Sequence, residues 1–176
     1  QKTAYEIRNC DWSSDVCSSD LFLGICFGMQ LAILEFATNI LKLHKPYSSE
    51  LEDNPAQNAE QVIGLMTEWQ NSETIETRSK NSDLGGTMRL GAYQCILKNN
   101  SKIAGIYDKQ NNKISERHRH RYEVTISYKE QFENAGLIFS GLSPDGALPE
   151  IIELQDHPFF IGVQFHPELK SNPLFT

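Results

Sequence analysis

The chain has 176 residues, of which 39% are hydrophobic, and it carries a formal net charge of -7. This length is sufficient for one domain with a sizeable core. The negative charge disfavours a general affinity for nucleic acids or anionic membranes, because both would repel the chain. No apolar run approaches the roughly 18 residues that a transmembrane helix needs, and the first twenty residues lack the pattern of a signal peptide.

Cysteine usage points to a reducing compartment. The four cysteines, Cys10, Cys17, Cys26 and Cys95, form no CxxC pair and are widely spaced. Neither a zinc site nor a disulfide framework is indicated by this spacing. We therefore expect a cytoplasmic protein without a bound metal.

The first twenty residues differ in character from the rest of the chain. The stretch Asp11–Asp20 has neither helical nor strand periodicity and stops abruptly at the apolar run Leu21–Leu23. Back-translation of residues 1–7 and 11–20 resembles a common short-read sequencing adapter. We interpret residues 1–20 as a translated assembly artefact and exclude them from fold reasoning. The alternative is a disordered polar N-terminus, and the underlying nucleotide sequence would decide between the two.

A strand, a sharp turn and a helix are predicted next. Leu21–Ile25 reads as a short buried strand and Met29–Leu41 as a helix. Cys26 lies between them, with Gly24 and Gly28 two residues away on either side. Glycines on both sides permit a strained turn that exposes a nucleophile to substrate.

The position of this cysteine predicts a reactive thiol. At a helix N-terminus the pKa of Cys26 should be lowered, because the helix dipole and free amides favour the thiolate. The backbone N–H of Phe27 could donate to an oxyanion. The alternative is a buried structural cysteine between chance glycines.

The middle of the chain alternates short apolar segments with polar ones. Residues 43–58 are polar and contain two prolines, which indicates a loop. The periodicity predicts these further elements: strands at Gln61–Met66 and Met88–Leu97, a polar surface loop from Gln70 to Asp83, and helices at Lys102–Tyr107 and Tyr128–Ala135, the latter ended by Gly136.

The final third is predicted to be rich in strands. Leu137–Ser140 and Glu150–Leu154 flank the turn signal Ser143–Gly146, and Phe159–Phe165 is an apolar run. The sequence His-Pro-Glu, residues 166–168, follows that run directly. A carboxylate bonded to one histidine nitrogen fixes the tautomer that the other nitrogen needs for proton transfer. Alone, this tripeptide is more often a surface turn, but together with the cysteine elbow it indicates a catalytic pair.

Four motifs carry a family resemblance. GICFGMQ (Gly24–Gln30) and QFHPE (Gln164–Glu168) resemble the class I, or triad, glutamine amidotransferases. GGTMRLG (Gly85–Gly91) and ERHRHRYE (Glu116–Glu123) are similar to the CTP synthases in particular. The similarity covers residues 21 to about 170.

This resemblance implies an α/β fold, namely a flavodoxin-like three-layer sheet of the class I glutamine amidotransferase type. Residues 21–176 would be a partial amidotransferase domain, with N-terminal strands and the last helix missing. One of the missing loops would supply the second oxyanion donor, whose loss costs about a hundredfold or more in turnover. We therefore expect the isolated chain to fold poorly and to show weak or no glutaminase activity.

The resemblance also assigns roles to residues that match the family motifs. Cys26, His166 and Glu168 match the catalytic triad. The matching glutamine contacts are Phe27, Gly28, Met29, Gln30, Glu50 and Arg121. A guanidinium such as that of Arg121 is well suited to bind a substrate carboxylate, and Glu50 could accept from the substrate ammonium. Arg89 matches a lid associated with activation by GTP.

The implied reaction joins ammonia from glutamine to UTP, with ATP activating the UTP. ATP, UTP and Mg²⁺ would bind a synthase domain outside this chain, which contains no phosphate-binding GxxxxGK[ST] motif. GTP would act as an allosteric activator, and the intact enzyme would be a homotetramer. The partners implied for this chain are glutamine and its own synthase domain.

Several alternatives remain open at this point. The run from Arg117 to Arg121 is by default a solvated cationic face or a nucleic-acid patch, and His118 with His120 is weak evidence for a metal site. Cys95, within a predicted strand, is more often a core thiol than a second nucleophile. Another class I amidotransferase, a gamma-glutamyl hydrolase of the same fold, or a noncatalytic GTP-sensing or assembly module would also account for parts of the pattern.

Overall fold

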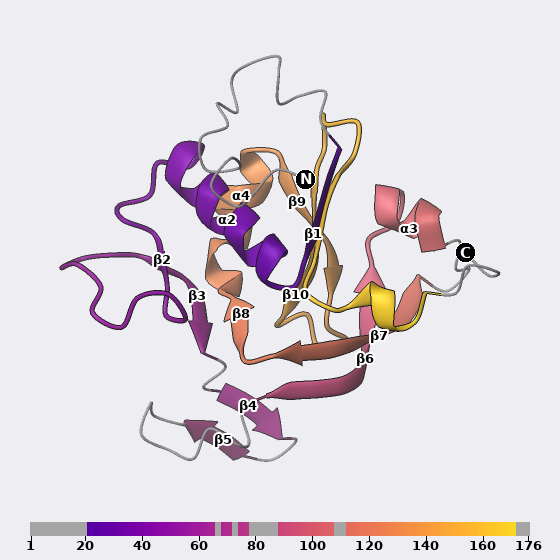
Figure 1. The fold of residues 1–176 in the computed structure, drawn as a ribbon, viewed down its shortest axis with the longest axis horizontal. Helices are drawn as coiled ribbons and strands as arrows, with labels where there is room; N and C mark the ends of the chain where they lie inside the picture. The colour runs from indigo at the N-terminus through magenta and orange to yellow at the C-terminus, as the bar shows by residue number, and fades with distance from the viewer. Residues whose placement is uncertain (1–20, 66–67, 72–73, 78–87, 108–111, 172–176) are drawn as a thin grey trace.

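The computed structural model describes residues 21–65, 68–71, 74–77, 88–107 and 112–171. A curved sheet forms the middle of the molecule, with helices α2 and α4 on one side and α3 on the other (Figure 1). This arrangement confirms the predicted α/β class. The segment interpreted as adapter-derived, residues 1–20, lies outside the described residues.

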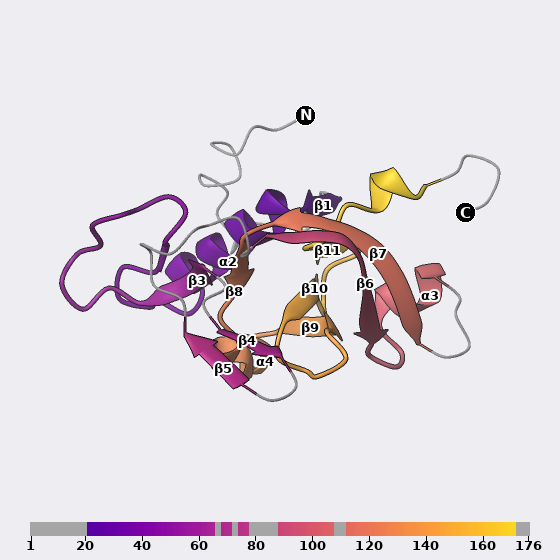
Figure 2. The same cartoon turned by 90° about the horizontal axis from the view of Figure 1, so that it is seen from below.

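The main sheet has six strands in the order β1-β11-β10-β9-β6-β7. Their bounds are Phe22–Ile25 (β1), Phe160–Val163 (β11), Pro149–Leu154 (β10), Leu137–Leu142 (β9), Arg89–Leu97 (β6) and Lys113–His120 (β7). β1 runs parallel to β11, and the other neighbours are antiparallel. Each of these strands except β7 had been predicted from the sequence. The strands β6 and β7 lie side by side as a long curved pair (Figure 2).

Two apolar clusters fill the space on either side of the sheet. Neighbouring residues of one strand contribute to different clusters, as Ile151 and Ile152 do, because side chains alternate across a strand. The first cluster joins the sheet to helix α2 (Phe27–Asn39) and helix α4 (Lys129–Asn134). The second joins it to the short helix α3 (Lys102–Tyr107). The protein is thus three layers deep, as the resemblance implied.

The helices agree closely with their predicted positions. α2 begins and ends two residues before the predicted helix, and α3 has the predicted bounds. α4 is preceded by a 3-10 turn, η2 (Ile126–Tyr128). Gly136 follows α4 with φ of 96°, so it adopts the left-handed conformation expected of a glycine that ends a helix.

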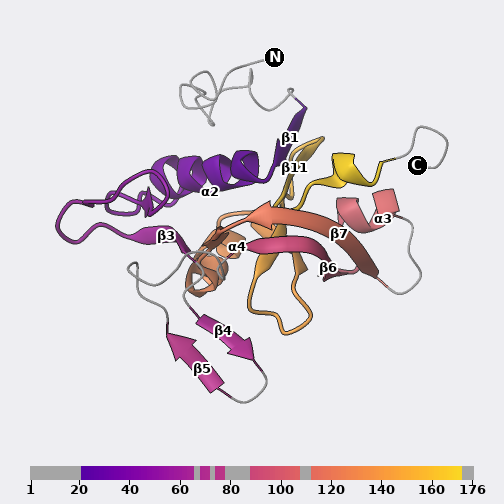
Figure 3. The same cartoon turned by 60° about the horizontal axis from the view of Figure 1, so that its bottom comes forward.

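Two smaller sheets lie beside the main one. The strands β2 (Tyr47–Ser48), β3 (Gln61–Leu65) and β8 (Tyr122–Val124) form the first, so the predicted loop over residues 43–58 includes a two-residue strand. The strands β4 (Glu68–Asn71) and β5 (Thr74–Thr77) form a hairpin that stands apart from the six-stranded sheet (Figure 3). The surface loop predicted from residue 70 is therefore wrong over residues 70–71 and 74–77. Residues 78–83 lie outside the described part.

Strand β7 is the longest of the strands that the sequence did not predict, the others being β2, β4, β5 and β8. Its burial alternates strictly, with Ile114, Glu116, His118 and His120 buried and the residues between them exposed. The buried positions are mostly polar, so the strand lacks the alternation of apolar and polar residues by which a half-buried strand is predicted. Among the described residues, no helix is long and apolar enough to cross a membrane.

Candidate active site

Cys26 occupies the sharp turn between β1 and α2. Its backbone angles, φ of 52° and ψ of -105°, are a strained combination for a residue with a side chain. The Cys26 N–H donates to the carbonyl of Val163 at 2.7 Å, which ties the turn to the end of β11. The predicted strained elbow is therefore confirmed.

The two flanking glycines play different parts in this turn. A Cβ atom on Gly24 would lie 2.9 Å from the carbonyl carbon of Gly28 and 2.9 Å from the Phe22 ring. A Cβ atom on Gly28 would meet nothing within 4 Å. Only Gly24 is required by close approach, so the expectation that both glycines are needed is wrong for Gly28.

The electrostatics of the thiol differ from the prediction. Burial raises the pKa of Cys26, and the nearby charges of Glu50 and Glu123 act in the same direction. The Phe27 backbone N–H and the Gln164 side chain lower the pKa, but they do not outweigh burial. The expected net lowering at the helix N-terminus is therefore wrong for the chain without substrate. The Phe27 backbone N–H favours the thiolate in the chain without substrate. Its predicted hydrogen bond to an oxyanion stays a prediction.

His166 and Glu168 lie just beyond β11, the strand next to β1. The register pairs Ile25 with Val163, so both strands end at the same edge of the sheet. Cys26 and the His-Pro-Glu segment are thereby brought to one edge, which is where ligands bind in parallel α/β sheets. The His166 backbone N–H donates to the Arg117 carbonyl at 2.8 Å, which fixes this segment against β7.

The predicted histidine–carboxylate pair is present. Nδ1 of His166 lies 2.7 Å from Oε1 of Glu168, within the 3-10 turn η3 (Pro167–Leu169) and its preceding residue. The side chains are 24% and 50% exposed, so the pair is accessible to substrate. Within the described residues, no hydrogen bond joins Cys26 to His166; the thiol instead accepts one from Gln164. The structure thus forms the histidine–carboxylate contact of the predicted triad but not the contact between Cys26 and His166.

The predicted glutamine contacts fall into two groups. Phe27 is exposed, Gly28 is partly exposed, and Arg121 is half-buried at the bend between β7 and β8. Met29 and Gln30 have buried side chains in the first turn of α2, so Met29 belongs to the core and can offer substrate only its backbone.

Glu50 lies in the turn after β2 and is exposed. Partial burial nevertheless raises the pKa of its carboxyl. Its charge contributes to the raised pKa of Cys26. The contact of Glu50 with a substrate ammonium stays a prediction.

Arg89 is placed differently from its prediction. It begins strand β6 rather than lying in a loop, and it is only 2% exposed. Its guanidinium pairs with Glu150 at 2.8 Å and Glu123 at 3.1 Å, and it stacks on the Tyr93 ring. The expected lid position is wrong in this conformation because the guanidinium is engaged by two buried carboxylates. A contact with GTP stays a prediction.

The two histidines of β7 belong to the same buried group. Nδ1 of His118 lies 2.8 Å from Nε2 of His120, and Nδ1 of His120 lies 3.2 Å from the Tyr122 carbonyl. Burial and the Arg89 charge lower the pKa of His118 to about 2 and that of His120 to about 3, so both are neutral. Burial raises the pKa of Glu123, while the adjacent Arg89 acts in the opposite direction.

The exposure pattern of β7 bears on two of the open alternatives. Arg117 and Arg119 face solvent, while His118 and His120, which alternate with them, face inward. The two exposed arginines fit the solvated cationic face that the sequence left open. Over the described residues, no group of three potential ligands could hold a metal ion. Cys95 is fully buried, as expected of a core thiol.

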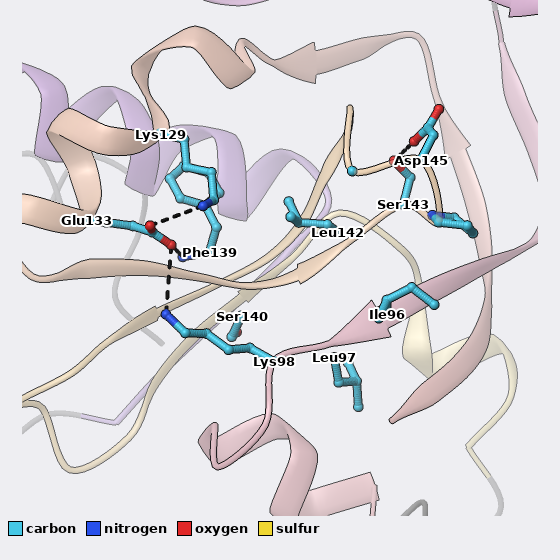
Figure 4. Close-up of a pocket in the computed structure, with 12 residues that line it drawn as sticks. Ile96, Leu97, Lys98, Lys129, Glu133, Phe139, Ser140, Leu142, Ser143 and Asp145 are labelled. Atoms are coloured by element: carbon cyan, nitrogen blue, oxygen red, sulfur yellow. Dashed lines mark hydrogen bonds and ion pairs between the residues drawn. The ribbon is translucent and has the colours of Figure 1, made fainter. Parts of the chain in front are cut away.

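A cavity of about 470 Å³ lies elsewhere, between the ends of β6 and β9, helix α4 and the Ser143–Gly146 turn. Lys98 and Lys129 converge there on the carboxylate of Glu133 (Figure 4). Its lining contains neither a cysteine nor a histidine. The elbow, rather than this cavity, therefore holds the groups that can carry nucleophilic chemistry.

Comparison with known proteins shows the family of the chain. The family profile described as Glutamine amidotransferase class-I matches residues 14–174. The chain belongs to the class I glutamine amidotransferase family. It is 57% identical over 152 residues to the CTP synthase of Maricaulis maris and 58% identical over 153 residues to that of Rhizobium meliloti.

These matches cover 86% and 87% of this chain but 27% of each relative. A solved structure, the glutaminase domain of the Trypanosoma brucei CTP synthase with bound acivicin, is similar with a TM-score of 0.72 and 33% identity. The match covers 88% of this chain and 55% of the chain of that structure. The resemblance to CTP synthases is confirmed, and the chain spans about a quarter of the length of these curated relatives.

Proposed function

We propose that this chain supplies ammonia by hydrolysing glutamine, as the glutaminase portion of a CTP synthase. The observation that carries the proposal is the strained Cys26 elbow at the same sheet edge as the His166–Glu168 pair. Similarity to CTP synthases favours this reading over a gamma-glutamyl hydrolase or another class I amidotransferase. The ammonia would be joined to UTP in an ATP-dependent step.

In the first half of the reaction, His166 takes the proton of the Cys26 thiol, and the resulting thiolate attacks the side-chain carboxamide carbon of glutamine. The resulting oxyanion accepts a hydrogen bond from the Phe27 backbone N–H. The carbon–nitrogen bond then breaks, and His166 donates a proton to the departing ammonia. This leaves a glutamyl thioester on the sulfur.

In the second half, His166 takes a proton from water, which attacks the thioester carbon. The carbon–sulfur bond breaks, releasing glutamate and restoring the thiol. Glu168 holds the imidazole orientation through its bond to Nδ1, so Nε2 is the atom left for proton transfer. Glu50 and Arg121 would bind the ammonium and carboxylate of the substrate.

The remaining assignments concern the longer relatives. ATP, UTP and Mg²⁺ would bind the part of those proteins that this chain does not span, and GTP would act as an allosteric activator of the intact enzyme. A homotetramer and a cytoplasmic location are likewise proposed for the intact enzyme. The chemistry that Mg²⁺ supplies, assistance to phosphoryl transfer, would take place away from Cys26.

Covalent labelling with acivicin, the compound named with the related glutaminase domain, tests this proposal. The Cys26 thiolate would displace chloride from the reagent, giving one adduct that mass spectrometry locates on Cys26. Cys26→Ala should abolish the adduct, whereas Cys95→Ala, which removes the buried thiol, should leave it unchanged.

Excess glutamine should slow this labelling, because substrate and reagent compete for one site. An adduct on another cysteine, or reversible binding without modification of Cys26, would contradict the proposal. The second outcome would favour a noncatalytic ligand-binding module.

A further inference from the structure

Two buried amide side chains form a chain of hydrogen bonds that ends at the Cys26 thiol. Gln164, which directly follows β11, is 0% exposed, and Gln30, in the first turn of α2, is 2% exposed. Nε2 of Gln164 lies 3.7 Å from Sγ of Cys26 and donates to it. Nε2 of Gln30 donates to the Tyr122 carbonyl at 2.9 Å and to Oε1 of Gln164 at 3.2 Å.

The contacts fix which end of each amide faces the sulfur. A backbone carbonyl can only accept, so the Tyr122 carbonyl requires the NH₂ group of Gln30 to face it. That NH₂ group then requires the carbonyl oxygen of Gln164 on its side. The NH₂ group of Gln164 is left facing Cys26. The orientation therefore follows from a chemical constraint, although nitrogen and oxygen of an amide look alike in shape.

A hydrogen-bond donor at this position offsets two effects that disfavour the Cys26 thiolate. Burial disfavours the charged thiolate, and Glu50 and Glu123 add negative charge nearby. A thiolate gains more from an N–H donor than a neutral thiol does, because hydrogen bonds to charged groups are stronger. An amide also cannot take the proton itself, so this role differs from that of His166.

We propose that Gln164 is a positioning residue that holds the Cys26 sulfur in its attacking orientation, and that Gln30 sets the direction of the Gln164 amide. The inference rests on the proposed function of Cys26. It uses only Nε2 of Gln30, and Oε1 of Gln30 is buried with no hydrogen-bond partner among the described residues, which leaves that oxygen for the expected contact with glutamine. Gln164 had entered the sequence reading only as part of the QFHPE motif.

The test measures the rate of Cys26 alkylation by iodoacetamide between pH 6.5 and 10, with the site resolved by mass spectrometry. Gln164→Met keeps an unbranched side chain of similar size and removes the donor. At pH 7 we expect a rate about three- to tenfold below wild type, the loss typical of one hydrogen bond. The deficit should shrink toward pH 10, where the thiolate forms without help.

Two controls separate positioning from general loss of structure. Ser140→Ala alters another fully buried polar side chain, located in β9, and should leave the Cys26 profile unchanged. Cys95, which is 0% exposed, reports on folding within each variant, because it should stay unlabelled while the core is intact. A variant in which Cys95 becomes reactive would be replaced by Gln164→Leu.

Gln30→Met tests the orienting step. It should lower the rate in the same direction, and it should have no further effect in a Gln164→Met background, because both changes act through one bond. The proposal would be overturned by a Gln164→Met profile that superimposes on wild type, by an equal deficit at every pH, or by additive effects of the two changes. Failure of wild-type Cys26 to react with acivicin would instead contradict the proposed function.

Discussion

Two cysteines of the same sheet lie in opposite surroundings. Cys26 directly follows strand β1 and is partly exposed, with a strained backbone and two N–H groups that favour its thiolate. Cys95 lies within β6, is 0% exposed and is close to the charges of Arg89 and Glu150. Burial raises the pKa of both thiols, and for Cys95 the rise is large enough to keep it protonated at any physiological pH.

Polar groups have different roles around the two cysteines. Around Cys95, charged side chains pair with one another inside the protein, as Arg89 does with Glu123 and Glu150. Around Cys26, donors are aimed at a single acceptor that remains open to solvent. A motif rich in charge therefore does not by itself mark the reactive region; access to the nucleophile does.

The largest effect is expected from breaking the buried charge group. Arg89→Met should lower the free energy of unfolding by about 3–5 kcal/mol, because it leaves two buried carboxylates without their cation. Urea unfolding followed by circular dichroism would measure the loss. Arg119→Met, on the exposed face of β7, is the matched control and should change stability by no more than about 0.5 kcal/mol.

Equal stability of the two arginine variants would show that the buried group does not support the fold. Arg89 would then be free to act as the lid residue that the family resemblance implied. In that case, the buried charged residues near Cys95 would have no role in stabilising the fold.

A smaller effect is expected at the elbow. Gly24→Ala should destabilise the chain by about 1–3 kcal/mol, because the new Cβ would lie 2.9 Å from backbone and must displace it. Gly28→Ala, whose Cβ meets nothing within 4 Å, should be nearly neutral for stability. Thermal unfolding of the two variants measures the difference, and equal midpoints would show that the turn tolerates a wider approach.

Much of the active site followed from local sequence patterns. A glycine-flanked cysteine between an apolar strand and a helix could adopt few backbone paths, so its elbow was predictable. The His-Pro-Glu segment was equally local, since a single residue, Pro167, separates the histidine from its carboxylate. That both lie at one sheet edge depends on β1 pairing with β11, a contact between residues more than 130 positions apart that the motifs implied only through family resemblance.

Other features required knowledge of long-range partners. The burial of Arg89 depends on Glu123 and Glu150, which come from other strands, so its surroundings could not be read from the flanking glycines. The net pKa of Cys26 depends on how far the fold buries the sulfur, a quantity that the helix position alone does not give. The alternating histidines and arginines of β7 did carry a period-two signal, and that signal could have identified the strand.

The fold makes Cys26 reactive and protects Cys95 from solvent. The most direct test compares alkylation rates of these two cysteines by iodoacetamide in the same molecule, first in native buffer and then in concentrated urea. We predict that Cys26 reacts about a hundredfold faster or more in the native chain, because Cys95 must await opening of the core. In urea the two rates should converge. Equal rates in native buffer, or a difference that persists in urea, would contradict the account.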